Sequence, residues 1–161
     1  MTDLVQAGLR RATPADAPAL ADLNDHVQLL HAGARPDQFS TVDHAAAQEF
    51  FTSILADAET LAWLADHDGR PVGYLYAVEV HRAANPFTTE LHTLYVHHLA
   101  VAPTARRLGV GSALLRAAEE HAQGAGLSGL RLDSWSFNSE AHAFFRLLGF
   151  EPFQTRFARD L

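Results

Sequence analysis

Residues 99–115 constrain the fold of this 161-residue chain more than any other segment. An apolar run is followed by a short loop, and Gly109 and Gly111 then open a helix with periodic apolar residues. The first amides of a helix have no intrahelical acceptor, and the helix dipole adds positive charge there. Glycines let a phosphate approach the backbone, and Arg106 and Arg107 can add charged hydrogen bonds. The segment therefore predicts a strand–loop–helix site for a phosphate group.

Two other glycine motifs do not fit this segment. The P-loop is excluded because no Gly-Lys-Ser/Thr follows, and the dinucleotide motif Gly-x-Gly-x-x-Gly is incomplete and comes late in the chain. Close packing of a helix on a sheet is an alternative role for Gly109 and Gly111, and the sequence leaves it open.

Hydrophobic periodicity and turn residues predict one domain over residues 1–161. Thr13 and Pro14 are typical of a helix start, and Leu20, Leu23 and Val27 follow at helical spacing. The expected strands cover about 8–12, 61–65, 72–80, 90–102, 130–135 and 150–159, and the expected helices about 13–31, 43–57, 109–123 and 138–148. We expect an α/β (α+β) domain with a mixed central sheet of about six to seven strands and about four flanking helices.

Composition and charge narrow the function. The chain has no cysteine, which excludes disulfides, thiol catalysis and thiolate metal sites. No signal peptide or apolar run of ~20 residues is present, so we expect a cytoplasmic protein without a membrane partner. The net charge is −7, and residues 1–60 carry nine acidic side chains against three arginines. This balance argues against nucleic acid and suits a cationic partner, although a solvated acidic surface is the more ordinary explanation.

Two signatures resemble those of one family. The pattern Arg106-x-x-Gly109-x-Gly111 resembles the pyrophosphate-binding signature of the GNAT superfamily of N-acetyltransferases. Downstream, Asn138-x-x-Ala141-x-x-x-Phe145-x-x-x-Gly149-Phe150 resembles the second signature of that family, and the order of predicted elements also agrees. The resemblance implies a GNAT-like domain that binds acetyl-CoA at a splay between parallel strands and transfers its acetyl group to a primary amine. Direct attack in a ternary complex is expected, because no cysteine can carry the acetyl group.

The resemblance also implies which residues contact the co-substrate. Amides from Arg107 to Ser112 would hold the pyrophosphate, strand backbone would pair with the pantetheine arm, and the amide of Val101 would polarise the thioester carbonyl. Asn138 fits a contact with the arm and a helix N-cap equally well. The implied set is Leu99, Ala100, Val101, Arg106, Arg107, Leu108, Gly109, Val110, Gly111, Ser112, Asn138 and Phe145.

Catalytic candidates come from the strand before the phosphate turn, because the family often takes its base or water-relay residue from that strand. Strict alternation places Tyr95 and His97 on one face with Leu99 and Val101, and His98 on the other. This favours His97, with Tyr95 beside it, whereas a β-bulge would favour His98. No metal is expected, because histidines on one strand make a poor metal site.

Position 145 departs from the family pattern. The family commonly has a tyrosine there, which is thought to protonate the leaving thiolate, and Phe145 has no hydroxyl. A non-catalytic acyl-CoA-binding or regulatory module therefore remains the alternative.

The acceptor is expected to be a small molecule, polyamine or peptide amine. A homodimer is left open, because Phe150, Phe153 and Phe157 suit either a core or a dimer contact.

Overall fold

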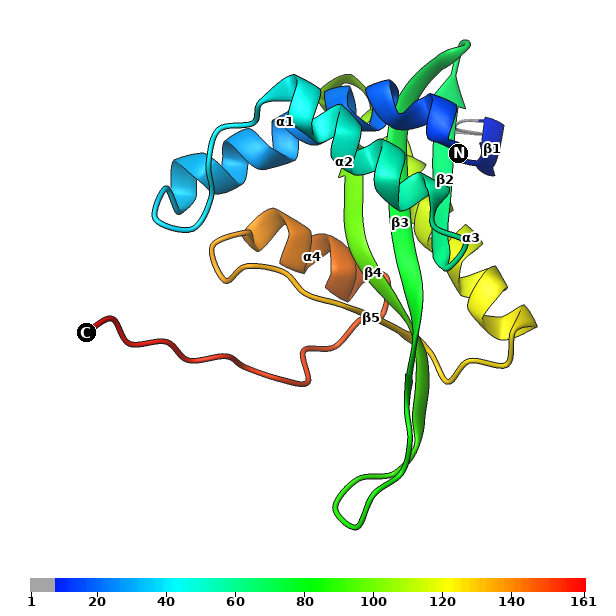
Figure 1. Cartoon of the computed structure of the whole chain (residues 1–161), viewed down its shortest axis with the longest axis vertical. Coiled ribbons are helices and arrows are strands. Elements are labelled where there is room, and N and C mark those ends of the chain that lie inside the picture. Colours follow the sequence, from blue (N-terminus) through cyan, green and yellow to red (C-terminus); the bar gives the residue numbers. More distant parts are fainter. Residues whose placement is uncertain (1–7) are drawn as a thin grey trace.

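The computed structural model describes residues 8–161 (Figure 1). Residues 1–7 lie outside the described residues. They include Asp3 of the acidic region and the start of the N-terminal stretch in which no signal peptide is expected. In chain order the elements are β1 (Gly8–Arg11), the 3-10 helix η1 (Pro14–Asp16), α1 (Ala17–Ala34), α2 (His44–Ala56), β2 (Thr60–His67), β3 (Arg70–Arg82), β4 (Leu91–Val101), the 3-10 helix η2 (Pro103–Ala105), α3 (Val110–Gly124), β5 (Leu130–Leu132) and α4 (Ser139–Leu147).

The strands form one mixed sheet in the order β1-β2-β3-β4-β5. The first three pairings are antiparallel, and β5 joins β4 in parallel. Asp68 and Gly69, with φ of +50° and +72°, make the tight turn between β2 and β3. That conformation suits a two-residue hairpin loop because its twist matches that of the strands.

The expected sheet of six to seven strands is wrong, since the described residues form five. The missing strand is the one expected at 150–159. This segment is extended but runs away from the sheet, and no described strand lies beside it to complete a ladder (Figure 1). Strand-like composition is not sufficient, because a strand also requires a partner for its backbone.

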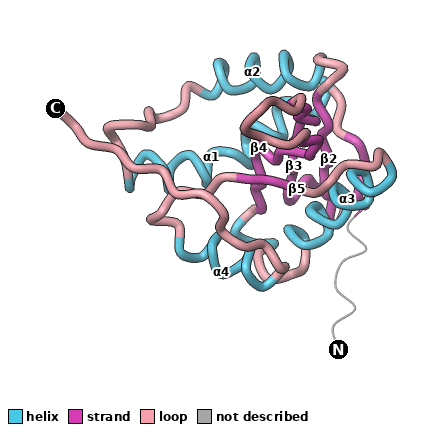
Figure 2. The backbone as a smooth tube through the Cα atoms, turned by 90° about the horizontal axis from the view of Figure 1, so that it is seen from below, coloured by secondary structure: helices cyan, strands magenta, loops and turns pink. Residues whose placement is uncertain are grey.

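Helices cover both faces of the sheet (Figure 2). One face packs against α1 and α2 through a core that includes Leu20, Phe51, Leu64 and Tyr74. The other face packs against α3 through Leu75, Leu94, Val96, Val110, Leu114 and Ala118, with α4 adding Phe144 and Phe145 at its margin. Alternate strand residues therefore serve different layers, as the pleat requires.

Capping residues explain where the first helices begin. The carboxylate of Asp16 accepts a hydrogen bond from the backbone amide of Thr13 at 2.8 Å and also pairs with Arg10 at 2.7 Å. These contacts lower the pKa of Asp16 to about 2, chiefly through the Arg10 hydrogen bond. Asp43 caps α2 by accepting from the amide of Ala45 at 3.0 Å. Both starts agree with those expected from the sequence.

Candidate active site

A β-bulge in β4 lies at the catalytic candidates. Tyr76 of β3 pairs with His98, whereas the next residue, Ala77, pairs with Val96, so His97 is an extra residue in the ladder. A bulge changes the alternation of side chains beyond it. Val96 and Leu99 therefore both contribute to the α3 side of the core, although three positions separate them.

The bulge overturns the strict alternation expected for this strand. The rings of His97 and His98 both lie against Tyr76, with centroids 5.3 Å and 4.7 Å from it, so both face the α1 and α2 side. Leu99 and Val101 lie on the opposite side, against the α3 core. The face shared by Tyr95, His97, Leu99 and Val101 was thus wrongly predicted, and the bulge considered as the alternative is present.

The pairing of the two parallel strands ends at the bulge. β5 pairs with β4 only at Leu94, Tyr95 and Val96. β4 continues to Val101 with β3 on one edge, but no described strand lies on its other edge over residues 97–101. One backbone edge of β4 beside the histidines is therefore left without a described strand partner, as the expected splay requires.

The loop after β4 presents backbone donors at the start of α3. Its helical turn η2 ends at Ala105, Arg107 has φ +63°, and the N-cap Gly109 has φ +83°, where glycine is favoured. None of the backbone amides of residues 107–112 donates to a backbone carbonyl within 8–161. Arg106 and Arg107 are exposed here. The arrangement has the donors and the charge that a phosphate requires.

The packing role considered for the two glycines belongs elsewhere. A Cβ on Gly73 of β3 would lie 2.9 Å from Cγ1 of Val110, so Gly73 provides the close approach of α3 to the sheet. A Cβ on Gly111 would instead lie 3.0 Å from Cζ of Phe144, which places Gly111 against α4. Gly109 has no atom near its missing Cβ, and its positive φ is what requires glycine.

His98 is held by a hydrogen-bonded chain. The hydroxyl of Tyr74 donates to Oδ1 of Asn24 at 3.2 Å and lies 3.0 Å from Nδ1 of His98. Because that hydroxyl has one proton, Nδ1 of His98 carries the hydrogen and donates to it, and Nε2 keeps its lone pair. Burial, followed by the charges of His97 and His31, lowers the pKa of His98 to about 4. His98 is therefore neutral near pH 7.

The hydroxyl of Tyr95 lies at the start of the splay. It donates to Oδ2 of Asp133, just after β5, and burial together with this hydrogen bond raises its pKa to about 12. The ring of His97 lies between those of Tyr76 and Tyr95, and burial lowers the pKa of His97. The three catalytic candidates are thus neighbours.

A pocket of about 560 Å³ opens beside His98. It lies between α1, α2 and the loop that connects them, and His97 is not among its lining residues. Its walls carry polar groups and the carboxylate of Asp43, and Phe50 and Phe51 form its apolar part. The lining residues are Asn24, Gln28, Ser40, Thr41, Val42, Asp43, Ala46, Ala47, Phe50, Phe51 and His98.

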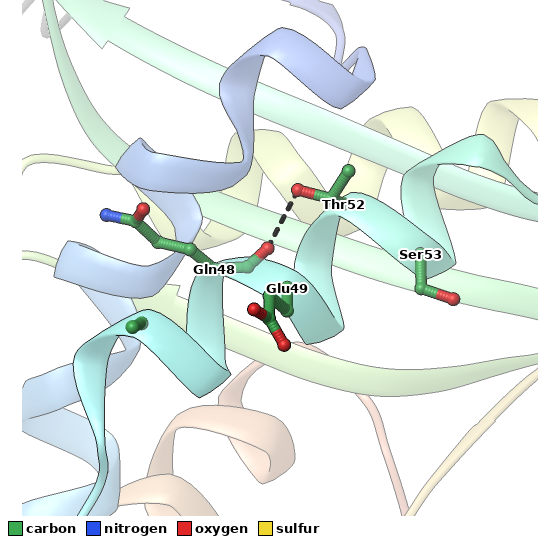
Figure 3. A pocket seen from close by; sticks show the side chains of 5 residues that line it. Gln48, Glu49, Thr52 and Ser53 are labelled. Carbon is green, nitrogen blue, oxygen red and sulfur yellow. Dashed lines mark hydrogen bonds between the residues drawn. The ribbon is translucent and has the colours of Figure 1, made fainter.

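A second hollow lies on α2 alone (Figure 3). Ala45, Gln48, Glu49, Thr52 and Ser53 line it, and Thr52 uses its hydroxyl to donate to the backbone carbonyl of Gln48 at 2.8 Å. Within residues 8–161 no second element lines this hollow, so the pocket at His98 is the stronger candidate for binding.

An aromatic group joins the end of α1 to the loop between β5 and α4. His31 stacks on Phe39 at 4.8 Å and meets Phe137 edge-on at 5.7 Å, and Phe39 packs against Trp135 at 5.2 Å. Burial lowers the pKa of His31. The α1 side of the site is therefore connected to the segment that leads into α4.

Residues of the second signature lie at α4. Asn138 is its N-cap, with Oδ1 accepting from the amide of Ala141 at 3.2 Å, so the cap interpretation is confirmed. Phe145 packs between Phe144 and Phe150, with centroids 5.5 Å and 5.8 Å away. A contact of Asn138 or Phe145 with acetyl-CoA stays a prediction.

Sequence reasoning missed Tyr74, Asn24 and Asp133. Each is a polar residue on a different element from the histidine or tyrosine that it contacts, and the sequence offers no spacing that joins them. Only the pairing of β3 with β4, and of β4 with β5, brings them to the site.

Two other kinds of site are absent from the described residues. No three or more His, Asp or Glu side chains within residues 8–161 are arranged to hold a metal ion. None of the described helices combines the length and the apolar character that a membrane crossing requires.

The fold is shared with several solved structures. The tetramutant of the BH1408 protein from Bacillus halodurans has a TM-score of 0.90 and 22% identity, covering 95% of this chain and 99% of that one. A transcriptional regulator from Bacillus halodurans C-125 has a TM-score of 0.75 and 19% identity, covering 97% and 100%. The aminoglycoside N-acetyltransferase AAC(6')-Iy in complex with CoA has a TM-score of 0.74 and 19% identity, covering 94% and 93%. These identities establish likeness of fold.

The sequence comparisons identify the family. No curated protein matches the chain. The sequence profile of the acetyltransferase (GNAT) family, however, matches residues 26–150, which span most of the pocket, the bulge, the phosphate turn and α4. More than half of the chain is covered by this match, and the fold agrees with that of a CoA-bound acetyltransferase. The chain therefore belongs to the GNAT family of acetyltransferases.

Proposed function

We propose that this chain is an acetyl-CoA-dependent N-acetyltransferase that acetylates a primary amine by direct attack in a ternary complex. The observation that carries the proposal is the row of backbone amides at 107–112, which have no backbone acceptor and lie directly after the free edge of β4. A diphosphate needs such donors, and an amide-containing arm needs such an edge.

The residues fit acetyl-CoA at both places. The amides of residues 107–112 and the guanidinium groups of Arg106 and Arg107 would hold the diphosphate. Backbone groups of Leu99, Ala100 and Val101 would pair with the pantetheine arm, and the amide of Val101 would donate to the thioester oxygen. Bound there, the co-substrate supplies an activated acetyl group.

His98 is our candidate for the general base. An ammonium with pKa near 10.4 is about 0.1% neutral at pH 7.4, a handicap of roughly 4 kcal/mol, so an acceptor gains from a group that takes its proton. The hydrogen-bonded chain through Tyr74 and Asn24 leaves the Nε2 lone pair available, and His98 lines the pocket. His97, or a water held by it, is the alternative base because it lies next to Tyr95.

A cationic acceptor suits the pocket and its surroundings. Asp43 lines the pocket, and Asp22 and Asp25 of α1 lie 3.0 Å and 3.7 Å from the ring nitrogens of His44, the residue after Asp43. A protein with this fold is an aminoglycoside N-acetyltransferase, and aminoglycosides are cationic amino sugars. Carboxylates near a pocket attract such molecules over several ångströms.

A non-catalytic acyl-CoA-binding module is the second candidate. Phe145 favours it, because no hydroxyl at this position can protonate a leaving thiolate. The fold is also that of a protein described as a transcriptional regulator. A thiol with pKa near 8.5 needs little protonation to leave at neutral pH, however, so Phe145 does not prevent transfer.

The test is calorimetric titration with acetyl-CoA, followed by thiol release on the same sample with a panel of amines. The cysteine-free chain contributes no thiol of its own, so any signal comes from released coenzyme A. Binding with amine-dependent release supports the transferase. Binding without release for any amine supports the regulatory module, and absence of binding contradicts both. A variant with Arg106→Gln and Arg107→Gln should bind acetyl-CoA more weakly than wild type. Arg116→Gln is the control, because Arg116 lies within α3, away from its first turn.

A further inference from the structure

Residues 133–138, which lead from β5 into α4, are held at both ends (Figure 1). At one end the carboxylate of Asp133 accepts a hydrogen bond from the hydroxyl of Tyr95 in β4. At the other end Oδ1 of Asn138 accepts from the amide of Ala141 at 3.2 Å and caps α4. The segment starts where the parallel pairing of β4 and β5 ends. In the proposed function the pantetheine arm would therefore lie between this segment and the unpaired edge of β4.

Aromatic rings join the middle of this segment to the first helix and the loop that follows it. His31, at the end of α1, stacks on Phe39 at 4.8 Å and meets Phe137 edge-on at 5.7 Å. Phe39 in turn meets Trp135 edge-on at 5.2 Å, and the guanidinium carbon of Arg35 lies 5.6 Å from the ring of Trp135. We call the four rings of His31, Phe39, Trp135 and Phe137 the aromatic clasp.

The aromatic clasp adjoins one wall of the acceptor pocket. Residues 40–42 directly follow Phe39 and line the pocket. The side-chain amide of Gln28 donates to the backbone carbonyl of Ser40 at 2.8 Å, so this wall is also tied to α1. The position of Phe39 therefore affects the shape of the wall.

The same segment is connected through α4 to the phosphate turn. A Cβ on Gly111 would lie 3.0 Å from Cζ of Phe144, so the first turn of α3 lies directly against α4. The phosphate turn, α4, residues 133–138 and the aromatic clasp thus form one continuous series of contacts that ends at the acceptor pocket. Packed side chains of this kind carry a coupling between two sites when both sites bias their arrangement.

We propose that Trp135 is a positioning residue that couples the binding of the two substrates. Acetyl-CoA fixes residues 133–138 when it binds beside β4, and the aromatic clasp transmits this to the pocket wall at residues 40–42. The acceptor then binds more tightly to the chain that already holds the co-substrate, and by reciprocity it strengthens co-substrate binding by the same factor. Trp135 is 38% exposed, so its packing on Phe39 has room to tighten. The inference rests on the proposed function, because it requires acetyl-CoA to bind beside β4.

The absence of native cysteine allows a test with one introduced thiol. Ser40→Cys places the thiol on the pocket wall, and the matched control Ser53→Cys places it on α2 outside that pocket. Both serines are exposed. The ligand is desulfo-CoA, because it has neither a free thiol nor an acetyl group to transfer. We expect it to slow maleimide labelling of Ser40→Cys about fivefold or more, the lower end of usual couplings between sites, and to leave Ser53→Cys unchanged.

Substitution of Trp135 separates transmission through the aromatic clasp from direct shielding by the ligand. With desulfo-CoA at saturation, the protection of Ser40→Cys should fall below about twofold in Trp135→Leu and persist in Trp135→Phe, which keeps a ring against Phe39. Phe39→Leu removes the same contact from the other side and should give the same loss, which covers the case that Trp135→Leu does not fold. Protection that is unchanged in the leucine variants would show direct shielding and overturn the inference.

The inference and the proposed function give way to different results. If desulfo-CoA does not bind in calorimetry, both are overturned. If it binds but labelling of Ser40→Cys keeps its rate, only the inference is overturned. With an amine that supports thiol release, Trp135→Leu should raise the KM for that amine about fivefold or more and change kcat less, because Trp135 adjusts the pocket and takes no part in the transfer. A fall in kcat with KM unchanged would contradict a positioning role.

Discussion

The tautomer of the His98 ring depends on the single hydroxyl proton of Tyr74. If Tyr74 donates to Asn24, then His98 must donate through Nδ1, and only Nε2 can accept a proton. Its low pKa makes it a weak base that is free at every pH from about 5 upward. If the acetylation rate falls with decreasing pH above pH 5, the fall therefore reflects protonation of the substrate amine and not of His98.

Substitution of the two adjacent histidines separates their roles. We expect His98→Ala to lower kcat ~10²-fold or more, within the range of a lost general base, and His97→Ala to lower it less. Steady-state thiol release with one amine measures both, and circular dichroism checks that both variants fold. A larger loss in His97→Ala would assign the base to His97.

The depressed pKa of His98 also makes stability depend on pH. Between the unfolded value of 6.5 and the folded value of about 4, the unfolded chain binds the extra proton, so this contribution is lost as pH falls through that window. The full shift corresponds to at most ~3 kcal/mol. Urea unfolding at pH 7 and pH 4.5 should therefore show a smaller loss for His98→Gln than for wild type. His67→Gln, at the end of β2, serves as control, and an equal loss in both variants would contradict the assignment.

At the scale of elements, the close contact of α3 with the sheet depends on Gly73. A Cβ there would lie 2.9 Å from Val110 and 3.0 Å from the carbonyl oxygen of Ala100, and the carbonyl cannot rotate away. We expect Gly73→Ala to lower the free energy of unfolding by about 1–3 kcal/mol. Gly124→Ala, at the open end of α3, should be neutral or stabilise by up to ~1 kcal/mol. Chemical denaturation of both measures the difference, and similar values would show that the α3 contact relaxes.

Element types could be predicted from the sequence where local signals decide them. Asp43 and Asn138 mark the expected helix starts, and in the structure each caps its helix. The bulge at His97 could not be predicted, because it depends on which residue of β3 lies opposite. The strand at 150–159 was wrongly predicted for a related reason, since propensity carries no information about whether a partner edge is available.

The same distinction between local signals and contacts across elements applies to the candidate site. The phosphate turn is local, so spacing and glycines predict it. The contacts of His98 with Tyr74 and Asn24 join three elements across the sheet and the first helix, so no local pattern could predict them.

At the scale of the molecule, the charge of −7 bears on how an acceptor is bound. The Debye length shortens from ~30 Å at 0.01 M salt to ~8 Å at 0.15 M, which weakens long-range attraction of a cation. We therefore expect the KM for a triamine such as spermidine to rise severalfold over this range, and the KM for butylamine to rise less. Initial rates at fixed acetyl-CoA measure both. An equal change in KM for the two amines would argue against a role for the acidic residues in binding the acceptor.

The extra residue in β4 has a genetic consequence. Loss of the single codon for His97 would restore a regular ladder with β3, because Val96 and His98 already lie opposite the adjacent residues Ala77 and Tyr76. Leu99 and Val101 would stay on the side of α3, and Ala100 would stay on the side of α1 and α2. A deletion of His97 should therefore disturb the fold little, and its main effect should be the loss of the ring that lies between Tyr76 and Tyr95.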